Sequence, residues 1–143
     1  MEEKVINILL VEDDEVDVMN VKRAFKKSNI SNPLFVAGNG LEALEMLRSS
    51  NKKPAQVPDN RRLILLDLNM PKMGGLEFLS ELRSDPELKA TPVIVLTTSD
   101  EDRDLVEAYN LNIAGYILKP VTFSKFASVI STLNKYWALC EFP

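Results

Sequence analysis

Four charged side chains follow three apolar runs, and their types and positions could support metal-dependent chemistry. Glu12 and Asp13 follow the run 6–11, Asp67 follows 63–66, and Lys119 follows 114–118. If these runs are parallel strands of one sheet, all four charges meet at its C-terminal edge, where open α/β folds bind their ligands. Two carboxylates in contact at such an edge repel each other by about 4 kcal/mol, so the cluster requires a cation.

The donor atoms of this cluster favour magnesium. Mg²⁺ prefers oxygen ligands, and the chain has no histidine and a single cysteine, which weakens the case for zinc or copper. We expect Asp13 and Asp67 to bind the ion directly, Glu12 to bind it through water, and the backbone carbonyl of Asn69 to be a further ligand. An alternative remains open, because Glu12 and Asp13 could serve only as favourable acidic residues at a helix N-terminus.

A divalent ion beside an aspartate makes that aspartate a competent phosphoryl acceptor, because the metal neutralises charge on both reacting groups. Asp67 is the candidate nucleophile. Lys119 offers an ammonium group that can follow a phosphoryl oxygen, and Thr97, which ends the fourth apolar run, offers a hydroxyl donor. Taken singly, the lysine could be a solvated loop charge and the threonine a β-branched residue that fills a strand.

The elements that must position these side chains alternate along the sequence. Short runs rich in Val, Ile and Leu predict strands at about 5–11, 33–38, 62–67, 92–97 and 114–118, and amphipathic stretches predict helices at about 14–28, 39–49, 75–84, 99–110 and 122–138. Five βα units with right-handed crossovers predict an α/β fold: a doubly wound, five-stranded parallel sheet with helices on both faces.

Apolar residues at helical spacing predict the buried face of each helix. They are Val18, Val21 and Phe25; Leu41, Leu44 and Leu47; Leu76, Leu79 and Leu82; Leu105, Val106 and Tyr109; and Phe126, Ile130, Leu133 and Trp137. Ser99, with Asp102 three residues later, predicts an N-cap close to a capping box for the fourth helix.

Length and composition predict one domain over residues 1–143, with a core at about 5–138, a polar loop at 51–61 and an aromatic tail at 139–143. The chain is 45% hydrophobic and 27% charged, which is typical of soluble proteins. We predict a cytoplasmic protein, because no apolar run is long enough to span a bilayer and the start lacks a signal peptide.

Several function classes are disfavoured. Without histidine there is no Ser-His or Cys-His nucleophile pair and no phosphohistidine donor. The net charge is −4, and the basic residues Lys22, Arg23, Lys26 and Lys27 fall on the solvent side of one predicted helix. We therefore expect no direct binding of nucleic acid.

The chain resembles the receiver domains of two-component response regulators, which have the CheY-like, flavodoxin-like (βα)5 fold. The resemblance rests on four segments in order: Ile8–Asp14, Leu66–Met73, Val95–Ser99 and Gly115–Pro120. It implies that Asp67 is the phosphoacceptor, that Glu12 and Asp13 bind Mg²⁺, that Thr97 and Tyr116 are switch residues, and that Lys119 senses the phosphate. It also implies a sensor histidine kinase as donor and a switched surface formed by the fourth helix, fifth strand and fifth helix.

Two features of the sequence bear on this resemblance. Gly74 stands where many relatives have an aspartate, so we expect the Gly74-Gly75 turn to be looser. The tail, with the long loop, resembles receivers that serve bacterial phytochrome-type kinases, several of which are dimers. We hypothesise a homodimer through the last two helical layers and the tail, in which Trp137 and Leu139 could instead pack on their own domain, whereas Phe142 is harder to place there.

The leading hypothesis is therefore a single-domain response regulator, a signalling protein and not an enzyme, that acts on an unknown downstream protein. One alternative is an unphosphorylated pseudo-receiver scaffold, although such a domain is expected to have lost Asp67, Thr97 or Lys119. Another is an aspartate-nucleophile phosphohydrolase, which would have a second carboxylate where this chain has Asn69. A flavin carrier would need a phosphate-binding loop after the first strand, where this chain has four acidic residues, 12–15.

Overall fold

The apolar runs form the five parallel strands that the sequence predicts, in a computed structural model that describes residues 5–50 and 53–143. The strands are β1 (Asn7–Val11), β2 (Leu34–Ala37), β3 (Arg62–Leu66), β4 (Val93–Thr97) and β5 (Gly115–Leu118), and their order in the sheet is β2-β1-β3-β4-β5. The helices are α1 (Glu15–Lys27), α2 (Gly40–Leu47), α3 (Gly75–Ser84), α4 (Asp102–Asn110) and α5 (Phe123–Trp137). This is the flavodoxin-like order, and its switch point lies between β1 and β3.

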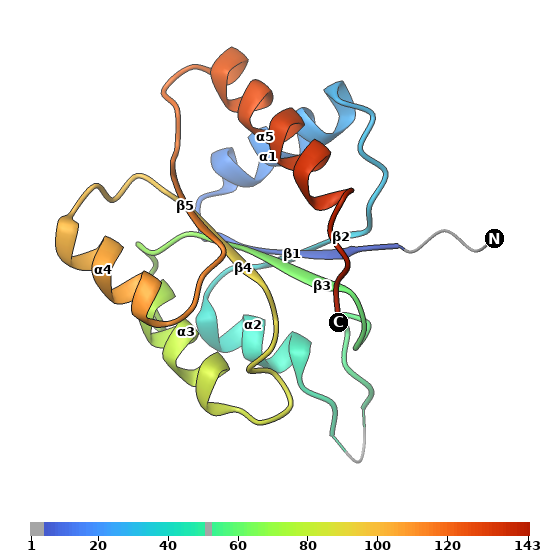
Figure 1. Cartoon of the computed structure of the whole chain (residues 1–143), viewed down its shortest axis with the longest axis vertical. Helices are drawn as coiled ribbons and strands as arrows, with labels where there is room; N and C mark the ends of the chain where they lie inside the picture. The colour runs from blue at the N-terminus through green and yellow to red at the C-terminus, as the bar shows by residue number, and fades with distance from the viewer. Residues whose placement is uncertain (1–4, 51–52) are drawn as a thin grey trace.

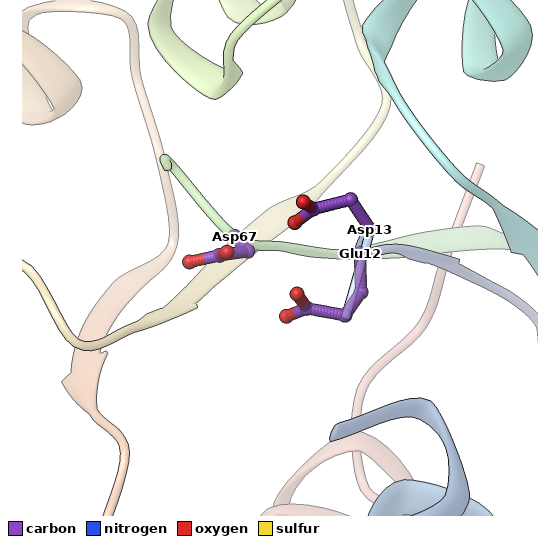
Figure 2. A group of neighbouring side chains, drawn as sticks. All are labelled: Glu12, Asp13 and Asp67. Atoms are coloured by element: carbon purple, nitrogen blue, oxygen red, sulfur yellow. The ribbon is translucent and has the colours of Figure 1, made fainter. Parts of the chain in front are cut away.

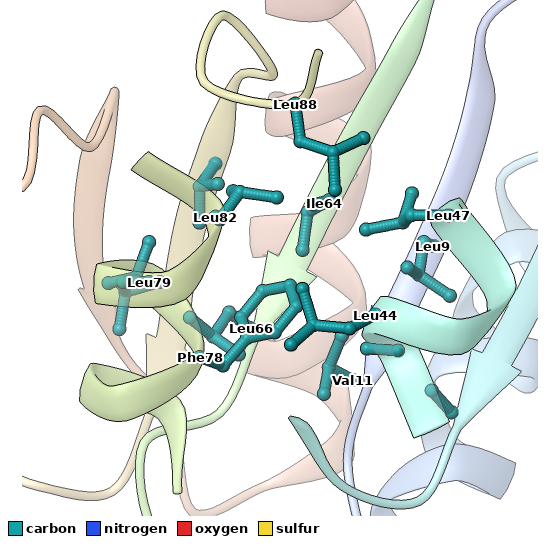
Figure 3. Packing of buried hydrophobic residues seen from close by; sticks show 14 of the residues in the cluster. Leu9, Val11, Leu44, Leu47, Ile64, Leu66, Phe78, Leu79, Leu82 and Leu88 are labelled. Carbon is teal, nitrogen blue, oxygen red and sulfur yellow. The ribbon is translucent and has the colours of Figure 1, made fainter. Parts of the chain in front are cut away.

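Helices cover both faces of the sheet, with α1 and α5 on one side and α2, α3 and α4 on the other (Figure 1). Successive residues of a strand point to opposite faces, so each strand contributes to two cores. In β1, for example, Leu9 and Val11 pack toward α2 and α3, whereas Ile8 and Leu10 pack toward α1 and α5. Figure 3 shows the first of these cores. The three middle strands are buried along their whole length, which explains why they lack polar alternation.

Helix starts depend on local capping. The side chain of Asp14 caps α1 by accepting from the amides of Val16 and Asp17. The prediction that Ser99 caps α4 is wrong: the N-cap is Glu101, which makes no side-chain cap bond, and the Ser99 hydroxyl instead donates to Asp104. The helix therefore begins three residues later than predicted.

Two predicted buried faces also need correction. Leu41 is exposed on α2, where Ala43 and Met46 are buried. The predicted apolar face of α4 is exposed, with Val106 at 59% and Tyr109 at 50%, and Ala108 is the buried residue of that helix. These helices pack at an angle set by the sheet, which spacing alone does not specify.

The C-terminal tail lies against the domain. Trp137 is buried and packs against Phe25, with ring centroids 6.1 Å apart. Phe142, which the sequence left without a place on the domain, packs against the α1–α5 core, whereas Leu139 is 86% exposed. A backbone hydrogen bond also holds the tail, since the Pro143 carbonyl accepts from the Arg61 amide at 2.6 Å.

The loop before β3 is held by a buried arginine. Residues 51 and 52 of the predicted 51–61 loop lie outside the described residues. In the rest of the loop, the Val57 amide donates to the carbonyl of Met46 in α2 at 3.1 Å. The Arg62 guanidinium donates to the carbonyls of Pro58, Val57 and Leu47 at 2.6, 2.7 and 3.0 Å. Val57 is fully buried, so this segment contributes to the core at the edge opposite the acidic cluster.

Candidate functional site

The acidic side chains meet at the C-terminal edge of the sheet, as predicted. One carboxylate oxygen from each of Glu12, Asp13 and Asp67 lies within 4.8 Å of the others (Figure 2). The cause is strand pairing: Val11 is in register with Leu66, and the Asp67 amide donates to the Val11 carbonyl at 3.0 Å. The residues that follow β1 and β3 are therefore neighbours.

Two of these carboxylates are buried. Glu12 is 3% exposed and Asp67 6%, whereas Asp13 faces solvent. Burial raises the pKa of Glu12 from 4.5 to about 7; Lys119 opposes that rise, and the charge of Asp67 adds to it. Gathering carboxylates away from water in this way is costly unless a cation accompanies them.

The fourth charge supplies one cation. The ammonium of Lys119, just beyond β5, donates to Glu12 Oε2 at 2.5 Å and to Asp17 Oδ2 at 2.9 Å, and it lies 3.9 Å from Asp67 Oδ1. Burial alone would lower the pKa of Lys119, but these carboxylates outweigh it and raise the pKa. Lys119 is therefore ionised, and its ammonium lies beside Asp67.

Asp17 is a site residue that sequence reasoning missed. It lies in the first turn of α1, four residues after Asp13, and that spacing at the start of a helix was the available signal. The Glu12 side chain accepts from the Asp14 amide at 3.1 Å, but the capping of α1 is done by Asp14. Glu12 pairs with Lys119 across the edge of the sheet, so its contacts are not limited to the start of α1.

The hydroxyl donors lie on the other side of Asp67. Thr97 is fully buried, and its hydroxyl donates to Asp67 Oδ1 at 2.7 Å. Tyr116 packs partly against the core, and its hydroxyl donates to the Ser99 carbonyl at 2.8 Å. Burial raises the pKa of Tyr116, which keeps the phenol protonated as a donor.

The turn after β3 brings the backbone of Gly75 close to the Asp67 carbonyl. A Cβ on Gly75 would lie 2.5 Å from the carbonyl oxygen of Asp67, so glycine is needed there because of the close approach. Neither Gly74 nor Gly75 has a positive φ, so neither glycine is needed there for a left-handed backbone. The looser turn stays a prediction. Asn69 is exposed in this turn, and its carbonyl as a metal ligand stays a prediction.

The donor set fits a hard divalent cation. Three carboxylates offer oxygen ligands within one ion's reach, and one of them is open to solvent, which suits an ion that keeps some of its waters. Such an ion would neutralise charge that Lys119 alone does not balance.

Comparison with known proteins identifies the family. Residues 8–131 match the response regulator receiver domain. The chain belongs to this family. Its fold and its phosphoacceptor role in two-component signalling follow from that membership. Receivers bind Mg²⁺ or Mn²⁺ at an acidic pocket, and an acidic cluster is present in this chain.

Two known proteins are similar over most of their length. The response regulator Rcp1 of Synechocystis sp. is 35% identical over 130 residues, which are 91% of this chain and 87% of that protein. The probable methanogenesis regulatory protein FilR2 of Methanothrix harundinacea is 36% identical over 130 residues, which are 91% of this chain and 82% of that protein.

Solved receiver structures agree with the fold. The phosphorylated cyanobacterial phytochrome response regulator RcpA has a TM-score of 0.86 at 34% identity, covering 98% of this chain and 99% of that chain. The Mn²⁺-bound form of Rcp1 has a TM-score of 0.83 at 34% identity, covering 96% and 99%. Within residues 5–50 and 53–143, no helix has the length and apolar character needed to cross a membrane.

Proposed function

We propose that Asp67 of this receiver accepts a phosphoryl group from a phosphohistidine of a sensor kinase. An Asp67 oxygen attacks phosphorus, the bond from phosphorus to the imidazole nitrogen breaks, and that nitrogen keeps the electron pair. The observation that supports this most directly is the placement of Asp67 beside two acidic residues, a half-buried lysine and a buried threonine hydroxyl. Mg²⁺, when bound, would neutralise charge on the attacking oxygen and the phosphoryl group.

The proposed ligands are Asp13 and Asp67 directly, Glu12 through water, and the carbonyl of Asn69. Their oxygen chemistry supports this set, and the short distances among the three carboxylates support one shared ion. Mn²⁺ in the Rcp1 structure is consistent with a similar site here.

The remaining roles belong to the chain's own donors. Lys119 has three N–H groups, of which Glu12 and Asp17 take two, and the third is available to a phosphoryl oxygen. Thr97 would donate to another phosphoryl oxygen, since its hydroxyl already lies on Asp67. The position of Tyr116 would then depend on that of residues 97–99, because its hydroxyl is bonded to the Ser99 carbonyl.

The decisive experiment is incubation with acetyl phosphate and Mg²⁺, followed by mass analysis of the intact protein. We expect one added phosphoryl group on the wild type and none on Asp67→Asn. Equal labelling of the two would disprove the assignment, and no labelling of the wild type would support a pseudo-receiver. Continuous turnover of a phosphate ester would contradict our proposal that the chain is not an enzyme.

We propose a phytochrome-type histidine kinase as the donor. The similarity to RcpA and Rcp1 across nearly the whole chain supports this. Phosphotransfer rates from purified candidate kinases would test it: a phytochrome-type kinase should label Asp67 at least about tenfold faster than unrelated kinases, a difference of about 1.4 kcal/mol in barrier. A cytoplasmic location follows from such a donor, because the kinase uses ATP.

We also propose that residues 1–143 act as one domain, form a homodimer through α4, α5 and the tail, and signal to a downstream protein rather than to nucleic acid. The exposed apolar side chains of Tyr136 and Leu139 support the dimer. Sedimentation of a chain that ends at Ala138 tests the tail, and Leu139→Ser tests it with Phe142 still packed. Unchanged self-association in both would remove the tail from the interface.

A further inference from the structure

Helix α4 is held by little apolar burial. Of its nine residues Ala108 is the buried one, whereas Leu105, Val106 and Tyr109 are exposed. Helix α3, by contrast, buries Phe78, Leu79 and Leu82. An element with few buried apolar contacts moves at low cost, so the polar contacts at its ends have a large share in fixing its position.

Both ends of α4 have such a contact. At its C-terminal end, Arg83 of α3 donates to the carbonyls of Leu111 and Asn112 at 2.7 and 3.2 Å. At its N-terminal end, where no side chain caps the helix, the Ser99 hydroxyl donates to Asp104 Oδ2 at 2.6 Å. The second bond is charge-assisted and joins the first turn of α4 to the segment that follows β4.

Ser99 is also bound to both proposed switch residues. Its amide donates to Thr97 Oγ1 at 3.3 Å, and its carbonyl accepts from the Tyr116 hydroxyl at 2.8 Å. Thr97 in turn donates to Asp67 at 2.7 Å. The amide, carbonyl and hydroxyl of this one buried residue therefore connect Asp67, β5 and α4.

We propose that the Ser99–Asp104 hydrogen bond couples the state of Asp67 to the position of α4, with Asp104 as a positioning residue. The inference rests on the proposed phosphoacceptor function. A phosphoryl group on Asp67 takes the Thr97 hydroxyl as a donor and fixes the Thr97–Ser99 segment, and Asp104 passes this constraint to the first turn of α4. Because coupling is reciprocal, the same bond holds Thr97 toward Asp67 and raises the affinity of the site for a phosphoryl group.

A double-mutant cycle tests the coupling in the full chain. The measured quantity is the affinity for beryllium fluoride, a phosphoryl mimic, in the presence of Mg²⁺. Ser99→Ala and Asp104→Ala should each weaken binding by about three- to tenfold, and the double variant should bind no more weakly than the weaker single variant, because both changes remove one bond. Asp104→Asn, which keeps an acceptor oxygen, should recover most of the loss.

A matched control is Asp102→Ala, which removes the same charge from the same turn of α4. The factors by which Asp102→Ala and Ser99→Ala weaken beryllium fluoride binding should multiply in the double variant, because no contact between Asp102 and Ser99 is found among the described residues. If the Ser99 and Asp104 effects also multiply, the two residues act independently and the proposed coupling is wrong.

Hydrogen exchange distinguishes coupling from a merely structural role, because it measures how α4 responds when the site is occupied. Beryllium fluoride should change the exchange of the amides of residues 102–110 in the wild type, and this change should shrink in Ser99→Ala and Asp104→Ala while α3 is unaffected. An unchanged α4 response in both variants overturns the coupling. Failure of the wild type to bind beryllium fluoride would instead overturn the phosphoacceptor function on which the coupling rests.

Discussion

The ammonium of Lys119 forms a partly buried ion pair with Glu12, its nitrogen 2.5 Å from Oε2, although the two residues are 107 positions apart in the chain. The pair occupies a carboxylate that we propose as a ligand of Mg²⁺. With Mg²⁺ bound there, Lys119 and the metal would compete for Glu12, and Asp17 would remain as a second partner for Lys119.

Replacing this lysine should strengthen metal binding and weaken phosphorylation. We expect Lys119→Met to bind Mg²⁺ about three- to tenfold more tightly at pH 8, because about 1 kcal/mol of competing attraction is removed. Calorimetric titration measures this. Lys125→Met, which removes the same charge from an exposed position, should change the affinity by less than about twofold. Equal affinities of all three proteins would contradict competition for Glu12.

Glu12 should make the stability of the metal-free protein depend on pH. Its pKa is about 7 in the folded protein and 4.5 as the ordinary value, so between these values the folded state holds a proton that the unfolded state has lost. The folded state then binds more protons, and the free energy of unfolding falls as the pH rises through this window, by about 1–3 kcal/mol. Denaturant titrations in EDTA measure it.

The control for the pH effect is Glu12→Gln, which cannot titrate. The difference in unfolding free energy between wild type and variant should change between pH 4.5 and 7 and be level outside that range. A difference that is constant with pH would show that burial does not shift this carboxyl.

Gly75 should be intolerant of any side chain. Gly75→Ala places a Cβ 2.5 Å from the Asp67 carbonyl oxygen and 2.7 Å from Leu68 Cα, so backbone must move. We expect a loss of about 2–4 kcal/mol in thermal or denaturant unfolding, with weaker Mg²⁺ binding because Asp67 shifts. Gly74→Ala is the matched control, since its nearest atom would be an ordinary 3.6 Å away. Similar losses in the two variants would contradict the steric explanation.

Arg62 should contribute to stability without contributing to metal binding. Arg62→Met leaves three carbonyls, of Pro58, Val57 and Leu47, without their donor, and we expect a loss of about 2–4 kcal/mol in unfolding free energy. Mg²⁺ affinity should stay within about twofold of the wild type, because Arg62 begins β3 and Asp67 follows its end. A variant that keeps its stability but loses Mg²⁺ binding would contradict a purely structural role for Arg62.

The sequence by itself determined the sheet and the meeting of the four charges. Long apolar runs such as Leu63–Leu66 cannot be satisfied at a surface, so they become central strands, and parallel pairing then brings Glu12, Asp13 and Asp67 to one edge. These outcomes depend on pattern and on strand geometry, both of which are local properties.

The tertiary structure decided the polar contacts among elements. Asp17 became a partner of Lys119, and Ser99 a partner of Asp104 instead of a helix cap, because the packing of α1 and α4 on the sheet sets which side chains come within hydrogen-bond distance. The contact of Phe142 with the α1–α5 core likewise depends on where α5 packs. Such distances depend on helix position to within about an ångström, and residue spacing does not carry that information.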